Sequence, residues 1–193
     1  LLDAGLAAYG RGATAEAVAL FARAVPAAPR DARLLNFLAM ARFADGGDAA
    51  VAEALAYAAH SVALDGRNPD LLANLAVVAK RRGDLDDAGV ALDRALALDP
   101  GHRAAGLNLV NLETARGRSE DAATRAEALA ARFPTDAGVL AAAAEALRAA
   151  GRLDAATAIA RRAVAVAPND ARHRITFGRI PDAVAKIMPK GDT

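Results

Sequence analysis

Apolar residues recur along the chain in pairs of short stripes, each with the spacing of one face of an α-helix. In the clearest pair the first stripe covers residues 71–79 and ends at Gly83, and the second covers residues 85–96 and ends at Asp99-Pro100. Glycine closes a helix because it adopts the left-handed backbone geometry at no steric cost. Proline ends the next helix because it lacks an amide donor. The pattern predicts two helices joined by a short turn.

The same punctuation returns every 34 residues, which indicates an internal repeat. Glycines stand at 83, 117 and 151, and prolines stand at 100, 134 and 168. Between each glycine and its proline an alanine recurs, at Ala88, Ala122 and Ala156. A small side chain at that position lets two helices cross closely. We therefore expect five units, over residues 1–31, 32–68, 69–102, 103–136 and 137–170, followed by residues 171–193.

The second unit is longer than the others. Gly66 stands where the pattern expects a proline, and it follows Pro29 by 37 residues, so this unit holds three extra residues. Glycine and aspartate favour turns. We therefore expect the three extra residues in the turn Asp45-Gly46-Gly47-Asp48.

A 34-residue helix-turn-helix with small and bulky residues at fixed positions, followed by proline, resembles the tetratricopeptide repeat. The third unit matches the first-helix pattern at Leu72, Leu75, Ala76 and Ala79, and the fifth matches it at Leu140, Ala143, Ala144 and Leu147. The resemblance covers residues 1 to about 170. It implies an all-α fold, a right-handed α-solenoid of five repeats, with a short C-terminal capping helix.

The resemblance also implies a concave groove lined by the first helix of each unit. The asparagines at 74 and 108 hold the same position in consecutive units, which resembles the asparagine ladders of peptide-binding members. A carboxamide offers donors and an acceptor to the backbone of an extended peptide, whatever its side chains. The candidate peptide-binding residues are Asn36, Phe37, Met40, Asn74, Lys80, Arg81, Asn108, Asn111 and Arg148; Phe43, Asp70, Val77, Leu107 and Glu145 hold inner positions as well.

Each of these residues also has a simpler explanation. The asparagines are equally explained as polar side chains wet by solvent, and Phe37 and Phe43 are also explained as packing between helices. Family members that clamp a C-terminal carboxylate carry a basic residue at certain inner positions of successive units. This chain offers only Arg33 there, so the resemblance does not imply a carboxylate clamp.

Composition argues against catalysis. Cysteine is absent, which excludes disulfides, thiolate metal sites and cysteine nucleophiles. His60, His102 and His173 fall in separate units without metal-ligand spacing, so we expect solvated side chains, and we predict no cofactor. The 24 basic and 23 acidic residues leave a net charge of +1, and the inner positions lack a basic and aromatic stripe, so we expect no nucleic-acid partner. No apolar run reaches the roughly 18 residues of a membrane span.

Residues 171–193 leave the repeat register. Five basic residues stand there against two acidic ones, a local net charge of +3. Ala183, Val184, Ile187 and Met188 have the spacing of one short amphipathic helix after Pro181. A terminal repeat needs a polar-faced element over its last apolar surface. We expect a capping helix, and the alternative is a linker to a further domain.

The sequence thus predicts a non-catalytic scaffold that binds a peptide or protein segment in its groove. The alternative is an accessory domain that presents substrate to a larger enzyme, such as a glycosyltransferase or a sulfotransferase. Because Leu1 takes the place of an initiator methionine, we expect an excised or processed piece. The alanine- and arginine-rich composition is typical of a GC-rich bacterial genome. We expect a cytoplasmic protein, with the periplasm as the alternative if a signal peptide has been removed.

Overall fold

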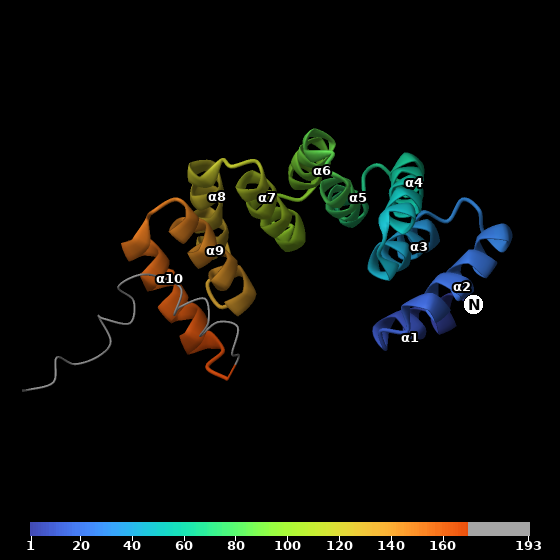
Figure 1. The fold of residues 1–193 in the computed structure, drawn as a ribbon, viewed down its shortest axis with the longest axis horizontal. Helices are drawn as coiled ribbons and strands as arrows, with labels where there is room; N and C mark the ends of the chain where they lie inside the picture. Colours follow the sequence, from blue (N-terminus) through green and yellow to red (C-terminus); the bar gives the residue numbers. More distant parts are fainter. Residues whose placement is uncertain (170–193) are drawn as a thin grey trace, which may run out of the picture. The chain divides into compact units, whose positions relative to one another are not determined.

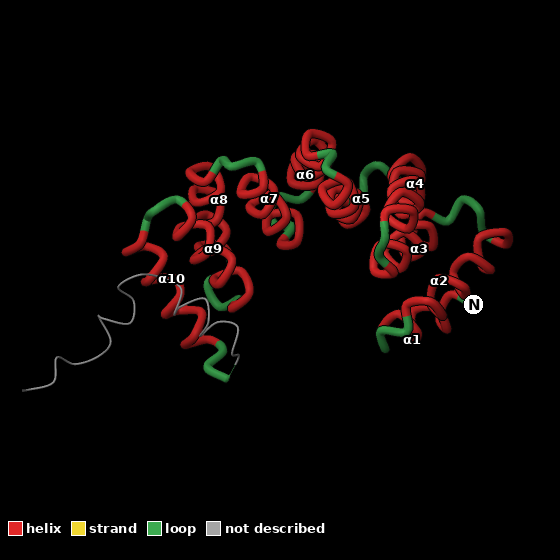
Figure 2. Tube along the Cα trace, in the orientation of Figure 1, coloured by secondary structure: helices red, strands yellow, loops and turns green. Residues whose placement is uncertain are grey.

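The computed structural model describes residues 1–169, and the predicted C-terminal cap lies outside this range. The described residues form ten α-helices and one short 3₁₀ helix, with no strand among them (Figures 1 and 2). The predicted all-α helical repeat solenoid is therefore confirmed. The helices are α1 (Leu2–Gly10), α2 (Thr14–Ala24), α3 (Ala32–Asp45), α4 (Asp48–Leu64), α5 (Pro69–Arg82), α6 (Leu85–Leu98), α7 (Arg103–Ala115), α8 (Ser119–Arg132), α9 (Ala137–Ala149) and α10 (Leu153–Val166), with the 3₁₀ helix at Val25–Ala27.

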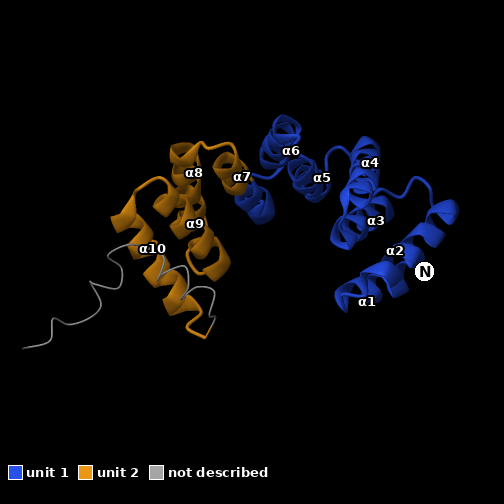
Figure 3. Cartoon of the chain, in the orientation of Figure 1, with its two compact units in different colours: residues 1–108 blue, residues 109–193 orange. Residues whose placement is uncertain are grey.

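The chain divides into two compact units, residues 1–108 and 109–193 (Figure 3). Unit 1 contains α1 to α6 and the start of α7. In the described part of unit 2, the rest of α7 is followed by α8, α9 and α10. Within unit 1, α3 contacts both α1 and α5, so the first helices of successive pairs touch one another. Each second helix lies beside the first helix of its own pair, α4 beside α3 and α6 beside α5 (Figure 3).

The first helices begin at side-chain caps. Asp31 Oδ1 accepts from the amides of Arg33 and Leu34, at 2.9 and 3.1 Å. Asn68 caps α5 in the same way, and Asp136 Oδ1 accepts from Val139 N at 2.9 Å. These caps satisfy backbone donors that a helix start leaves unpaired. They stand at one repeat position and so fix where each first helix begins.

The turn inside each pair requires a left-handed residue. Gly83 has φ +97°, and the backbone amide of Asp84 donates to Ala79 O at 3.0 Å. The turns at Gly12, Gly117 and Gly151 repeat this geometry, with φ between +74° and +75°. A side chain at such a φ is strained, which accounts for glycine at each of these positions.

The three extra residues of the second repeat, residues 32–68, lie in α4 and not in the turn, so that expectation was wrong. Two residues, Gly46 and Gly47, separate α3 from α4, and two residues also separate α5 from α6. Helix α4 has 17 residues, whereas α6, α8 and α10 have 14 each. Three residues add nearly one helical turn, so the longer helix keeps its apolar face toward its neighbours.

Small residues fill the positions where helices meet. Ala88, Ala122 and Ala156 are at most 1% exposed, as are the equivalent Ala17 and Ala54. In unit 1, one cluster joins α1, α2 and α3 around Phe21, and another joins α4 and α5 around Val51, Ala54 and Val78. A thin core of methyl groups therefore holds adjacent helices together.

Candidate functional site

The predicted inner positions of unit 1 lie on α3 and α5, which contact each other. Counted from the caps Asp31 and Asn68, these positions recur every three or four residues, so their side chains share one side of each helix. We call this set the first-helix surface. Its residues are Asn36, Phe37, Met40, Phe43, Asp70, Asn74, Val77, Lys80 and Arg81.

Two asparagines of this surface bond to each other. Asn74 Nδ2 on α5 donates to Asn36 Oδ1 on α3 at 3.1 Å. Asn36 is only 7% exposed, so the bond satisfies an acceptor that has lost its water. Asn74 is half-buried, and its side-chain oxygen has no hydrogen-bond partner within residues 1–169. The pair therefore fixes the orientation of Asn74 and leaves its acceptor available.

The apolar members of the surface also pack between helices. Phe37 is half-buried and stacks on Phe21, with ring centroids 5.9 Å apart and an interplanar angle of 21°. Met40 and Phe43 are half-buried against the cluster that includes Val51. Each of these side chains thus contributes to the core on one side and keeps part of its area exposed.

Positive charge gathers on the first helices of unit 1. Helices α3 and α5 together carry five basic residues against two acidic ones, a net charge of +3. Lys80 is half-buried and Arg81 is exposed, and neither forms an ion pair within the described part of the chain. Arg81 also lines a hollow of about 380 Å³ beside Asp48 at the start of α4. These two cations are available to an acidic or carbonyl group of a ligand.

His102 was expected to be solvated, and the structure corrects this. Its side chain is 11% exposed, and its Nδ1 accepts from the amide of Ala105 at 3.0 Å, which caps α7. Its Nε2 lies 2.9 Å from Asp70 Oδ1, on the first-helix surface. A neutral imidazole accepts at one nitrogen and donates at the other, so both contacts fit one tautomer. The signal was in the sequence, because His102 follows Asn68 and precedes Asp136 by 34 residues each.

The remaining candidate residues lie on α7 and α9. Leu107 and Asn108 are half-buried in unit 1, and Asn111 is exposed in unit 2. Arg148 Nε donates to Glu145 Oε2 at 2.9 Å, so these two residues of α9 pair with each other. Within unit 1, the structure thus brings Asn36 and Asn74 together, whereas no hydrogen bond joins Asn108 to either of them.

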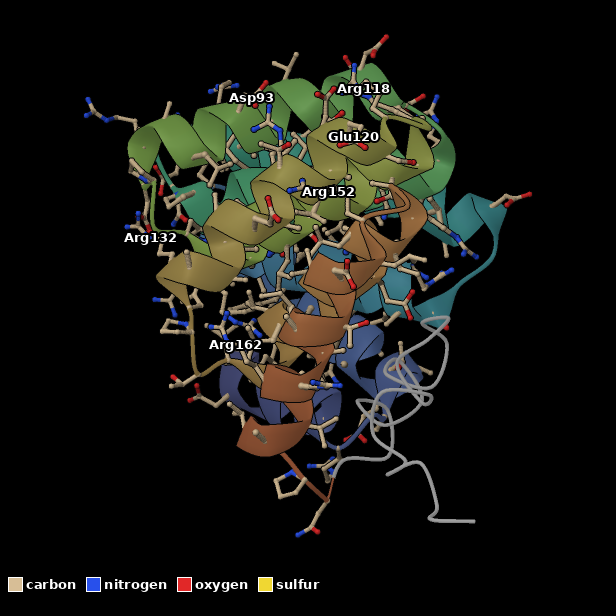
Figure 4. The ribbon with its side chains drawn as sticks, turned by 90° about the vertical axis from the view of Figure 1, so that its left-hand side faces the viewer. Asp93, Arg118, Glu120, Arg132, Arg152 and Arg162 are labelled. Carbon is tan, nitrogen blue, oxygen red and sulfur yellow. The ribbon has the colours of Figure 1, made fainter. Side chains whose placement is uncertain are left out.

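Sequence analysis missed the most buried carboxylate of the described part of unit 2. Glu113 is 4% exposed, and Arg118 donates to both of its oxygens, with Nη2 at 2.9 Å from Oε1. Arg116 Nη1 lies 3.5 Å from Glu113 Oε1. Arg118 stands at the turn before α8, and Arg152 stands at the equivalent turn before α10 (Figure 4). Because two arginines from the adjoining turn neutralise Glu113, it acts as a structural anchor.

The described residues contain no group of three or more metal-ligating side chains. No helix among them is long and apolar enough to cross a membrane. The described residues thus form helix pairs with left-handed glycine turns, and a hydrogen bond between side-chain amides joins two of the first helices.

The sequence model of the tetratricopeptide repeat family matches residues 79–137. The solved structure of TTC0263, a thermophilic TPR protein of Thermus thermophilus, superposes with a TM-score of 0.75 and 26% identity. That match covers 95% of this chain and 97% of TTC0263. Residues 79–137 thus carry a tetratricopeptide repeat, and the described residues share the fold of a tetratricopeptide repeat protein.

Two further solved structures share the fold of this chain. PilF of Pseudomonas aeruginosa gives a TM-score of 0.79 at 19% identity, over 96% of this chain and 82% of PilF. YrrB, a TPR protein with an unusual peptide-binding site, gives 0.65 at 15% identity, over 90% of this chain and 88% of YrrB. None of the curated proteins matches the chain by sequence. These two structures therefore show that the chain has the fold of an α-helical repeat solenoid.

Proposed function

We propose that the chain is a non-catalytic scaffold that binds an extended peptide or protein segment along the first-helix surface of unit 1. The observation that carries the proposal is the Asn36–Asn74 bond, which holds one carboxamide in place between α3 and α5. An oriented carboxamide is suited to pair with a peptide backbone, because it offers fixed polar atoms regardless of the ligand's side chains.

The neighbouring side chains support a ligand with mixed chemistry. Val77 and Met40 are half-buried apolar side chains on the same surface, and they would contact aliphatic groups of the ligand. Lys80 and Arg81 follow at the end of α5 and would meet carbonyl or carboxylate oxygens. Such a surface combines apolar contacts with a few placed polar groups, as binding sites commonly do.

Val77→Arg tests this function. A random-peptide library displayed on phage would first be selected against the wild-type protein, and the selected peptides would then be titrated against the variant. Because Val77 lies between Asn74 and Lys80 on one side of α5, a long arginine should obstruct the ligand and weaken binding by about tenfold or more, which corresponds to about 1.4 kcal/mol.

Asn108→Ala and Val90→Lys accompany this test. Asn108 has no side-chain hydrogen bond within the described residues, so its removal should reduce affinity without lowering the melting temperature. Val90 lies on α6, away from the first-helix surface, so Val90→Lys should not weaken the binding of those selected peptides that Val77→Arg weakens. Selected peptides that bind Val77→Arg as tightly as the wild-type protein would contradict the proposal.

Asn74→Ala is a poorer test than the sequence alone indicated. From the sequence, loss of Asn74 should leave the melting temperature nearly unchanged. The structure shows that Asn74 satisfies the buried Asn36 acceptor. An unsatisfied buried acceptor costs about 1–3 kcal/mol, so this variant should weaken stability as well as binding.

A further inference from the structure

A second hollow in unit 1 lies on the side opposite the first-helix surface. Its volume is about 310 Å³, and it is lined by Leu55 and Ala59 of α4, by Leu75 and Ala79 of α5, by Asp84, and by Asp87, Val90, Ala91 and Arg94 of α6. We call it the α4/α6 pocket. At 100° per residue, Leu75 and Ala79 point away from Asn74 and Val77 on α5. The pocket is therefore separate from the proposed peptide-binding surface.

The exposed valine of this pocket is not required by the repeat. Leu55 packs partly against the cluster of Val51, Ala54 and Val78, and the first repeat carries an apolar residue, Val18, at the same position. The other repeats hold Ala19, Ala56, Thr124 and Ala158 at the Val90 position, yet Val90 is 61% exposed. Because the other helix pairs form with small or polar residues at this position, packing alone does not explain Val90.

Two carboxylates line the pocket, Asp84 and Asp87, and Asp84 pairs with Arg82. Helices α4 and α6 carry five acidic residues against one arginine, a net charge of −4. The equivalent helices of unit 2 are close to neutral, with net charges of −1 for α8 and +1 for α10. Asp87 at the pocket and Asp93 farther along α6 are exposed, and neither forms an ion pair within the described residues (Figure 4). The one basic residue, Arg94, is turned to the carbonyl of Gly66 at 3.4 Å.

We propose that the α4/α6 pocket is a second docking site, for a basic segment of a partner protein in which a large aliphatic side chain is flanked by lysine or arginine. The aliphatic side chain would fill the hollow between Leu55, Leu75 and Val90. The flanking cations would meet the carboxylates of Asp87 and Asp93. Apolar anchors in a pocket supply affinity, and complementary charge around it supplies specificity and association rate.

Three capped synthetic peptides test this proposal. The first has the pattern Lys-Leu-Ala-Lys-Leu-Ala-Lys, the second replaces each lysine by glutamate, and the third replaces each leucine by alanine. Calorimetric titration of the wild-type protein should give an affinity for the first peptide about tenfold or more above that for either of the others. Equal affinity for the glutamate peptide, or for the peptide without leucine, would overturn the proposal.

Val90→Lys and Thr124→Lys form a matched pair of variants, because both positions are exposed and occupy the same place in consecutive repeats. Val90→Lys should lower the affinity for the basic peptide by about tenfold or more, and Thr124→Lys should leave this affinity unchanged. Val77→Arg should also leave it unchanged, which separates this site from the proposed peptide-binding surface. Unchanged binding to Val90→Lys would refute the site.

Sedimentation distinguishes a partner from a second copy of the chain. We expect the wild-type protein and Val90→Lys to sediment at the same mass. A wild-type dimer that Val90→Lys dissociates would overturn the proposal, because the pocket would then serve self-association.

Discussion

At the scale of single residues, small side chains decide how closely the helices approach. Gly5 in α1 is buried, and a Cβ built there would lie 2.5 Å from Cε1 of Phe21. Phe21 in turn is fully buried and stacks on Phe37 of α3. A single missing methyl group therefore permits the aromatic pair that joins the first three helices. Such packing has little tolerance, since protein cores are close-packed.

Gly5→Ala should destabilise the protein by about 1–3 kcal/mol, because the added methyl group overlaps the Phe21 ring. Gly10→Ala in the same helix is the control, since nothing lies within 4 Å of its Cβ position. Alanine favours a helix over glycine by about 0.5–1 kcal/mol, so the control should be neutral or stabilising. Urea unfolding of the two variants measures the difference, and equal midpoints would contradict the packing argument.

At the scale of elements, long-range polar contacts tie one helix pair to the next. His102 caps α7 and reaches Asp70 at the start of α5. Arg94 reaches the carbonyl of Gly66, and the equivalent Arg162 in unit 2 reaches the carbonyl of Pro134 at 3.5 Å (Figure 4). These contacts hold the helix ends and loops in register, whereas the alanine-rich core fixes only the distance between helices.

His102→Ala should lower the free energy of unfolding by about 1 kcal/mol, because α7 loses its side-chain cap. His102→Asn should recover most of this loss, since asparagine is a good cap and already serves at Asn68. Thermal unfolding followed by circular dichroism checks both variants. If His102→Ala has the same melting temperature as the wild-type protein, the cap makes no measurable contribution to stability.

At the scale of the whole molecule, stability is expected to vary along unit 1. In a repeat protein each element is stabilised by its immediate neighbours. Helix α5 contacts α3, α4 and α6, whereas α1 contacts only α2 and α3 among the described helices. The first-helix surface and the α4/α6 pocket both use α5, so both sites depend on a helix that is supported by three neighbouring helices.

Amide hydrogen exchange should show this gradient. We expect the amides in the middle of α5 to exchange more slowly than those of α1, because α5 packs against three described helices with more contacts than α1 makes with α2 and α3. Mass spectrometry of peptic fragments measures both helices in one experiment. Uniform protection across α1 to α6 would indicate that unit 1 unfolds only as one cooperative body.

The repeat and the fold class could be predicted from the amino-acid pattern alone. Periodic glycine, proline and alanine are local signals, since each acts on the backbone or the packing of its own helix. They predicted the helix pairs and the buried Ala88, Ala122 and Ala156. Local patterns do not define which side chains of one repeat contact the next repeat.

Which side chains meet depends on the packing of the helices in three dimensions. Asn36 and Asn74 are 38 residues apart, and His102 and Asp70 are 32 residues apart. Their contacts depend on how α3, α5 and α7 pack, not on any one helix. Packing likewise put the three extra residues into α4 and left a pocket between α4 and α6. Contacts at such separations arise from the summed geometry of several helices, which periodicity within one helix does not specify.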